Sequence, residues 1–342
     1  MSTIQVLCIG DPHFKVGNVP ESDDMTNKLI KIAEAITPKF IVVLGDILHR
    51  HEKIHVSPFM RAEVLVQELS KISPTFVIVG NHDRPNNSTW MTNDHPFNGM
   101  KLWPNTYVVD EKVLDANIGG FRFLFVPYVF PGKFMETLIH EDKGVKAPLE
   151  GTTAIFCHQE FRNAKMGMIK SQVGDPWDES NPLIISGHVH DYDMLQPNLI
   201  YVGTPMQHAF GDRADKTISL YTFSPDILDS KNSWEEARID LGLTKRVIVY
   251  LTPEKFHTYE PPSDKLIKVV VQGDDASVKA ASKLEKVKEL RKKGIKVIFK
   301  AKKSDTSVIT KGPSLRMRYK DRLYTEICKD PKQLEWFHKF FK

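Results

Sequence analysis

Short apolar runs alternate with amphipathic stretches in the first hundred residues of the chain. The runs at residues 4–9, 40–44 and 75–79 are five or six residues long and rich in isoleucine, valine and phenylalanine, which is typical of buried strands. Between them, residues 24–36 and 57–73 carry apolar side chains at helical spacing. This β-α-β-α-β order predicts parallel strands joined by crossover helices.

After residue 100 the pattern changes to short strands with few helices between them. The predicted strands are residues 107–109, 113–114, 121–126, 153–157, 183–186, 199–202 and 217–223. A two-sheet β-sandwich flanked by helices, within the α/β class, accommodates both halves of this pattern.

A domain boundary is predicted near residues 252–265, where Pro253, Pro261 and Pro262 interrupt the pattern. We therefore expect two domains, residues 1–250 and residues 251–342. In the second, we predict a small α/β unit with strands at 266–271 and 295–301, a helix at 276–293 and a terminal helix at 320–342.

Composition indicates the class of protein and its expected cellular location. Hydrophobic residues make up 41% of the chain and charged residues 26%, which is ordinary for a globular protein. No apolar run reaches the roughly 18 residues that a membrane span needs. The N-terminus has no basic segment before its apolar run, so it is read as a strand and not as a signal peptide. Three cysteines cannot all pair. Reduced thiols, and an intracellular, cytoplasmic location, are expected.

The net charge of +4 hides an asymmetry. Residues 245–342 hold 25 Lys and Arg against 12 Asp and Glu, a net of +13, whereas residues 1–244 hold 22 against 31, a net of −9. An acidic body is expected where carboxylates bind cations, and a basic tail favours a polyanionic partner. A solvated lysine-rich surface is the alternative.

Five motifs of carboxylate, imidazole and amide side chains each follow a predicted strand. They are Asp11-Pro12-His13, Gly45-Asp46, Gly80-Asn81-His82-Asp83, His158 and Gly187-His188-Val189-His190. One histidine after a strand is usually only half-buried structure, but the ordered set is unlike chance. These side chains suit Mn, Fe or Zn. The glycines before Asp46, Asn81 and His188 are expected to let the chain turn sharply off its strand.

The ordered set resembles the signature of the calcineurin-like metallophosphoesterase superfamily: D-x-H, GD, GNH(D/E), H and GHxH. The resemblance covers residues 1–225 and implies two divalent metal ions, with Mn²⁺ expected and Fe²⁺ or Zn²⁺ as alternatives. The implied ligands are Asp11, His13, Asp46 and His190 for one ion, and Asp46, Asn81, His158 and His188 for the other. Asp46 would therefore bridge.

The resemblance also implies that His82 assists catalysis without binding metal and that Asp83 orients it. Such a centre suits phosphodiester cleavage, because two cations stabilise charge on the phosphoryl oxygens and lower the pKa of a water. A histidine beside them can protonate the departing oxygen. For Asp83, a surface turn residue is the alternative.

Two further segments resemble the SbcD-type DNA repair nucleases, in compact versions found in phage and large DNA viruses. Residues 45–49 match the GD-x-x-H element, whose histidine, here His49, is implied to lie near the scissile phosphate; a solvent-facing helix-start residue is the alternative. Residues 201–205 and Lys216 match the segment after GHxH, although Thr204 replaces the usual serine.

The basic second domain lies where those nucleases carry a DNA-binding cap. Nine cations there are candidate phosphate contacts: Lys286, Lys288, Arg291, Lys292, Lys293, Lys296, Lys300, Lys302 and Lys303. The resemblance implies an SbcC-type coiled-coil ATPase as partner. The aromatic stretch 336–341 could be its docking face or could pack on its own domain. A homodimer is a further possibility, and no membrane partner is expected.

The sequence therefore predicts an SbcD-like metal-dependent DNA nuclease, a double-strand exonuclease and single-strand endonuclease acting in DNA repair, recombination or replication. A small-molecule phosphodiesterase, for example of cyclic nucleotides, shares every metal motif and is the alternative. A non-catalytic scaffold is a third reading, although such proteins typically lose ligands that this chain retains.

Overall fold

The computed structural model describes residues 2–51, 53–139, 149–167, 169–225 and 234–302. By contacts the chain divides into two compact units, Met1–Ile248 with Pro261–Lys268, and Val249–Glu260 with Val269–Lys342. The boundary predicted after residue 250 falls inside strand β15 (Arg246–Leu251). The predicted terminal helix at 320–342 lies outside the described residues.

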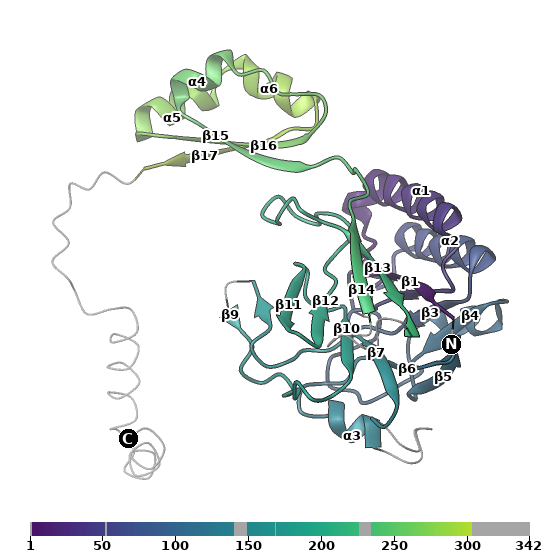
Figure 1. Cartoon of the computed structure of the whole chain (residues 1–342). Coiled ribbons are helices and arrows are strands. Elements are labelled where there is room, and N and C mark those ends of the chain that lie inside the picture. Colours follow the sequence, from purple (N-terminus) through teal and green to yellow (C-terminus); the bar gives the residue numbers. More distant parts are fainter. Residues whose placement is uncertain (1, 52, 140–148, 168, 226–233, 303–342) are drawn as a thin grey trace, which may run out of the picture. The chain divides into compact units, whose positions relative to one another are not determined.

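The first unit contains two six-stranded sheets (Figure 1). One has the order β14-β13-β1-β2-β3-β4, in which β1 to β4 are parallel and β13 and β14 are antiparallel additions. Its strands are β1 (Ile4–Ile9), β2 (Phe40–Val43), β3 (Thr75–Ile78), β4 (Thr106–Val109), β13 (Ile218–Phe223) and β14 (Trp234–Ile239).

The second sheet has the order β11-β12-β10-β7-β6-β5, with β6, β7, β10 and β12 parallel. Its strands are β5 (Leu114–Ile118), β6 (Phe121–Val126), β7 (Thr152–Cys157), β10 (Leu183–Ser186), β11 (Asp193–Gln196) and β12 (Leu199–Tyr201). A two-stranded ribbon, β8 (Lys165–Met166) and β9 (Ile169–Lys170), stands apart from it. The predicted α/β fold with two sheets flanked by helices is confirmed.

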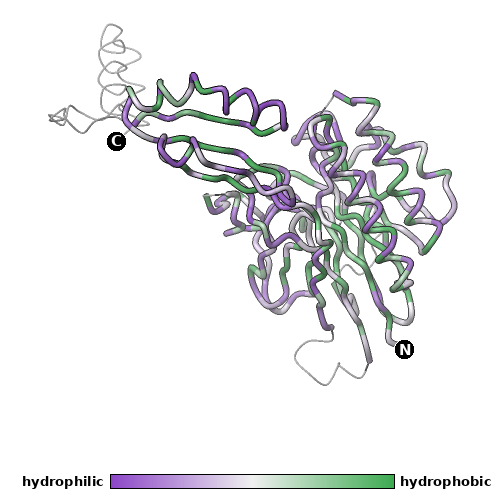
Figure 2. The backbone as a smooth tube through the Cα atoms, turned by 90° about the horizontal axis from the view of Figure 1, so that it is seen from above, coloured by the Kyte–Doolittle hydropathy of each residue, from purple (hydrophilic) through white to green (hydrophobic). Residues whose placement is uncertain are grey.

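Alternation along β1 shows how one strand serves two cores. Leu7 and Ile9 are buried in the layer with the two long helices, α1 (Val19–Ile36) and α2 (Val56–Ile72). Val6 and Cys8 point to the opposite face, where the two sheets pack on each other. The inner strands are hydrophobic along their length, whereas the helices alternate between polar and apolar faces (Figure 2).

The layer between the sheets is built mainly from phenylalanine rings. The fully buried Phe40 of β2 has four aromatic neighbours, with ring centroids 5.3–5.9 Å away, in edge-to-face geometry; they are Phe76, Phe123, Phe125 and Phe156. Because these rings join β2 and β3 of one sheet to β6 and β7 of the other, they fix the two strand-end rims that carry the polar motifs.

The shorter helices of the first unit are α3 (Phe134–Ile139) and the 3₁₀ segments η1 (Val16–Asn18) and η2 (Pro96–Leu102). Across the described part of the chain, no helix combines the length and apolar character needed to cross a membrane.

The second unit includes three helices, α4 (Pro253–Thr258), α5 (Asp275–Ser282) and α6 (Glu285–Lys292). A three-stranded sheet has the order β15-β16-β17, with β16 (Leu266–Gly273) and β17 (Lys296–Ala301). Strand β17 and most of β16 belong to this unit. The single helix predicted at 276–293 is wrong. Leu284 has extended backbone angles, φ −66° and ψ 144°, and caps a new helix. Because the helix breaks at Leu284, Val278 on α5 and Leu290 on α6 are both buried.

Candidate metal centre

The predicted ligands come together because they follow parallel strands. Asp11 and His13 follow β1, Asp46 follows β2, and Asn81 follows β3 of the first sheet. His158 follows β7, and His188 and His190 follow β10 of the second sheet. The carboxyl ends of parallel strands share one edge of a sheet, so the first sheet supplies four of these residues and the second sheet three.

A first group of side chains surrounds His13. Its Nε2 lies 3.0 Å from Nε2 of His190 and 3.7 Å from Oδ2 of Asp46. His190 Nε2 is in turn 4.0 Å from Oδ2 of Asp11. Asp11, His13 and His190 each offer an atom within 4.8 Å of the others, which is close enough for one ion to bind all three.

A second group shares Asp46 with the first. Asp46 Oδ1 lies 3.3 Å from Nε2 of His158, which is 3.0 Å from Oδ1 of Asn81. Nδ1 of His188 lies 3.0 Å from the same Asn81 oxygen and 3.2 Å from His158 Nε2. Asp46 thus turns Oδ2 toward the first group and Oδ1 toward the second, the arrangement of a bridging carboxylate.

The chemistry of these atoms fits bound cations. His158 Nδ1 donates to the carbonyl oxygen of Leu44 at 2.7 Å, so in the neutral ring Nε2 carries a lone pair. That lone pair faces oxygen lone pairs of Asp46 and Asn81, with no proton to separate them. A divalent cation resolves such a contact, and the set of nitrogen and oxygen donors suits transition metals. The two groups therefore fit two divalent metal ions.

Burial and charge shift the acid–base properties of the centre. Burial raises the pKa of Asp11 to about 6, with Asp46 adding to the effect and His158 opposing it. Burial alone would lower the pKa of His158, but Asp46 and Asp11 outweigh it and raise that pKa to about 9.

Three of the ligands adopt left-handed backbone angles that non-glycine residues usually avoid: His13 (φ 46°), Asp46 (φ 47°) and His188 (φ 81°). Such strain is typical of functional sites. The expectation that glycine allows a sharp turn before each motif holds for Gly45, with φ 94°. Gly80 and Gly187 serve close approach instead, since a Cβ would lie 2.2 Å from Asp46 N and 2.3 Å from Leu44 O.

His82 lies beside the ligands. Its side chain is 32% exposed, and its Nε2 is 4.0 Å from Asp46 Oδ2. Its Nδ1 pairs with the carbonyl oxygen of His49 at 2.8 Å, which directs Nε2 toward the centre. The backbone N–H of His82 donates to Asp46 Oδ1 at 2.8 Å.

The expectation that Asp83 orients His82 through a hydrogen bond is wrong. The buried Asp83 carboxylate accepts backbone N–H groups of Ile47 (3.3 Å), Leu48 (2.8 Å) and Gly80 (3.0 Å). It therefore ties the loop after β2 to the loop after β3 and acts on the geometry of the ligands as a whole. A surface turn, the alternative for Asp83, is also wrong.

His49 is half-buried, and its ring packs edge-on against His13 with centroids 5.2 Å apart. Burial lowers its pKa to about 4, with Lys15 adding to the effect. Helix α2 begins only at Val56, so the alternative of a solvent-facing helix-start residue does not describe His49.

Most of the side chains that support the centre were not singled out by the sequence pattern; Lys216, which matches the segment after GHxH, is the exception. Tyr128 stacks on His188 with centroids 5.9 Å apart. His208 Nε2 donates to the carbonyl oxygen of Asp11 at 3.1 Å. Lys216 Nζ donates to the carbonyl oxygen of His190 at 2.7 Å. Glu160 lies 3.9 Å from His188 Nε2; its place two residues after His158 was the one clue available.

Comparison with known proteins agrees with this geometry. Residues 4–227 match the calcineurin-like phosphoesterase family, and the chain belongs to that family. It is 36% identical over 305 residues to "Putative phosphoesterase 078R" of Invertebrate iridescent virus 3, covering 88% of this chain and 85% of the relative. It is 35% identical over 286 residues to "Putative phosphoesterase 244L" of Invertebrate iridescent virus 6, covering 83% and 99%. The protein is a metallophosphoesterase.

Metal binding is expected to stabilise the fold. Cations would neutralise Asp11 and Asp46 and separate His13 from His190. The unfolded chain does not bring these side chains together, so the metal binds the folded state and stabilises it. With free Mn²⁺ at about 100 times its Kd, the free energy of unfolding should rise by about 2.7 kcal/mol. Urea denaturation with Mn²⁺ or with a chelator measures this, and equal midpoints would contradict it.

Glu160→Gln is expected to weaken metal binding by about 10- to 100-fold, because a carboxylate beside the second nitrogen of a ligand histidine fixes the ring and raises its basicity. The neighbouring His188 imidazole, the largest cause, lowers the pKa of Glu160, and burial opposes this. Calorimetric titration with Mn²⁺ checks the prediction. Lys165→Met, which removes the exposed partner of Asp193, is the control and should leave the affinity unchanged.

Proposed function

We propose that this phosphoesterase is an SbcD-like, Mn²⁺-dependent DNA nuclease, an exonuclease on duplex ends and an endonuclease on single strands. The observation that carries the proposal is a cationic pocket of about 500 Å³ that shares His49 with the metal centre. A polynucleotide has further phosphates next to the one being cleaved, and such a pocket suits them.

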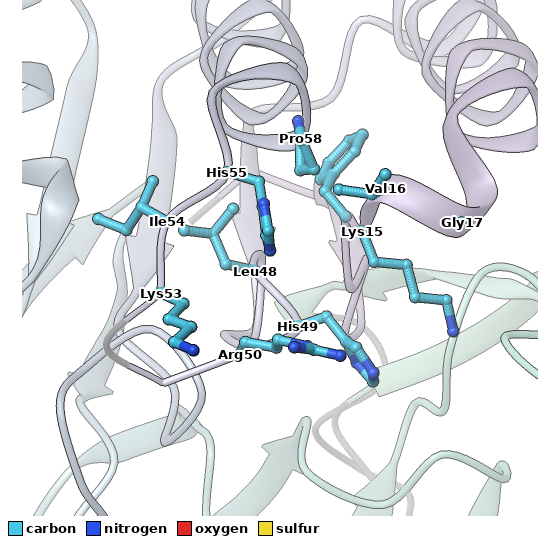
Figure 3. Close-up of a pocket in the computed structure, with 11 residues that line it drawn as sticks. Lys15, Val16, Gly17, Leu48, His49, Arg50, Lys53, Ile54, His55 and Pro58 are labelled. Atoms are coloured by element: carbon cyan, nitrogen blue, oxygen red, sulfur yellow. The ribbon is translucent and has the colours of Figure 1, made fainter.

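The pocket is lined by Lys15, Arg50 and Lys53 together with His49 and His55, and no carboxylate is among its described lining residues. Figure 3 shows Lys15, His49, Arg50 and Lys53 extending to the same side of it. The rest of the lining is largely apolar: Phe14, Val16, Leu48, Ile54 and Pro58. Cations above an apolar floor suit a nucleotide, with phosphate at the rim and sugar or base below.

The chain's own groups have separable roles in the proposed hydrolysis. Bound metal ions would supply positive charge for the phosphoryl oxygens and activate water. His82 is aimed at the centre by the His49 carbonyl, which accepts from Nδ1–H; in the imidazolium form, which also carries hydrogen on Nε2, it would donate that Nε2 proton to the departing oxygen as its bond to phosphorus breaks, leaving the neutral ring. Lys15, Arg50 and Lys53 would hold the neighbouring part of the strand.

The basic second unit supports the proposal less strongly than its composition suggests. Lys286 pairs with Glu260 and Lys288 with Glu285, so part of that charge is balanced within the unit. Lys303 and the aromatic stretch 336–341 lie outside the described residues. The ATPase partner and the homodimer therefore stay predictions.

A small-molecule phosphodiesterase remains the second candidate, since the metal centre serves any phosphodiester. The two are separated by assaying labelled duplex DNA and circular single-stranded DNA beside bis-p-nitrophenyl phosphate and a cyclic nucleotide, each with Mn²⁺. DNA cleavage that is lost in His82→Ala would support the nuclease. Turnover of the small esters alone, with DNA intact even beside a cognate ATPase, would overturn it.

A further inference from the structure

A second histidine, His51, lies against the face of His82. The two rings are stacked, with centroids 4.6 Å apart and planes inclined by 21°. His51 is half-buried and is none of the implied metal ligands. Its contact is with the histidine beside the metal centre, whose Nε2 must be aimed at the reacting atoms.

His51 is itself held in place. Its Nδ1 lies 3.0 Å from the carbonyl oxygen of Arg84; a carbonyl only accepts, so Nδ1 carries the hydrogen. One edge of the His51 ring is thus fixed to the loop that follows His82, while its face covers the His82 ring.

The Arg84 carbonyl is a rigid anchor because the Arg84 side chain is buried and fully engaged. The residue is 2% exposed. Its guanidinium donates to the carbonyl oxygens of Tyr128, at 2.8 Å, and Thr89, and lies over the Tyr128 ring, 5.1 Å from its centroid. The residue that holds His51 is therefore tied to the segment that also contacts His188.

We propose that His51 is a positioning residue for His82. The His49 carbonyl accepts from Nδ1 of His82, the His13 ring packs edge-on against it at 5.2 Å, and the His49 ring lies parallel to it at 6.0 Å. His51 is the nearest of these rings, at 4.6 Å, and its stacking holds the plane of the His82 ring so that Nε2 faces the departing oxygen. The inference rests on the role proposed for His82 but not on DNA as the substrate.

The test compares two esters that differ only in their leaving group, thymidine 5′-(p-nitrophenyl) phosphate and thymidine 5′-phenyl phosphate. The nitrophenolate departs without a proton, whereas the poorer phenolate needs help from His82. His51→Ala should lower kcat for the phenyl ester by about 10-fold or more, since small misplacements of a catalytic group are costly. It should change kcat for the nitrophenyl ester by less than about 3-fold and leave KM unchanged.

Two further variants make the result decisive. His51→Phe keeps a flat ring and should restore most of the lost rate, and His51→Ala should cause little further loss in a His82→Ala background. Retained nitrophenyl ester turnover shows that the variants fold and bind metal. Equal losses on both esters, or a full additional loss in the His82→Ala background, would overturn the proposal. Because DNA is not used, failure of the nuclease assignment leaves this test intact.

Discussion

Asp46→Asn is expected to lower phosphoesterase activity by about 10³-fold or more, which corresponds to losing several kcal/mol of transition-state stabilisation from the metal pair. Asp46 lies between both groups of ligands, facing one with Oδ2 and the other with Oδ1. The substitution keeps size and shape but gives up the negative charge and one of the two oxygens. Activity with Mn²⁺ on bis-p-nitrophenyl phosphate measures the effect.

The backbone of the Asp46→Asn variant should be intact. Asparagine tolerates the left-handed angles found there, φ 47°, and its remaining oxygen can still accept the His82 N–H. The loss should therefore be accompanied by disappearance of the Mn²⁺-dependent rise in stability. An inactive variant that still shows the full rise would contradict the bridging position of Asp46.

Asp110→Asn is the matched control, because Asp110 is also a buried carboxylate but lies outside the centre. Burial would raise the pKa of Asp110, but His95 and Lys101 outweigh this and hold it below its ordinary value. Its stabilising effect is thus complete at neutral pH and is lost as pH falls through the lowered pKa. The control should lose about 1–3 kcal/mol of stability and keep both activity and the response to Mn²⁺.

The sequence predicts which strand-end side chains the structure brings together, because strand ends are local features. The runs before Asp11, Asp46 and Asn81 are apolar enough to identify parallel strands, and parallel strands place their following residues together. Contacts made by main-chain atoms have no such signature. The carbonyl of His49 takes the orienting position beside His82 that the pattern assigned to Asp83, and any residue at position 49 would supply that carbonyl.

Strand β14 and the break between α5 and α6 were missed for a different reason. β14 carries charged and polar side chains at an edge of its sheet, with Glu236 bonded to Tyr192 and Tyr221, so it lacks an apolar run. Around Leu284 the helical spacing of charges and apolar residues continues through the break, and only tertiary packing of the two short helices reveals it.

The segment after GHxH that resembles SbcD-type nucleases has a structural role in this chain. That role would be needed whatever the substrate is. Thr204 N–H donates to the carbonyl oxygen of His190 at 3.0 Å, and Lys216 Nζ reaches the same oxygen. Both residues hold the loop that carries His188 and His190. This part of the resemblance concerns the metal centre, and in our proposal the pocket beside the centre selects the substrate.

Removing the three pocket cations, by Lys15→Met, Arg50→Met and Lys53→Met together, is expected to weaken cleavage of DNA by about 10²-fold at low salt. Methionine keeps a flexible aliphatic side chain in the pocket lining but removes the charges that would contact phosphates. Bis-p-nitrophenyl phosphate has no neighbouring phosphate, so its turnover should change by less than about 3-fold. The ratio of the two rates measures the effect without depending on how much enzyme is active.

The salt dependence of DNA affinity tests the same variant independently. Each phosphate contact contributes about 0.9 to the slope of log affinity against log salt on duplex DNA, so losing three contacts should make the slope shallower by about 2 to 3. Lys71→Met, Lys112→Met and Lys170→Met, three exposed lysines outside the pocket lining, lower the net charge equally. If this control flattens the slope as much, the effect is one of overall charge. If neither variant alters DNA cleavage, the strand is held elsewhere. If the rates of DNA cleavage and of bis-p-nitrophenyl phosphate turnover fall together, the pocket supports the metal centre itself. That result would favour the small-molecule phosphodiesterase.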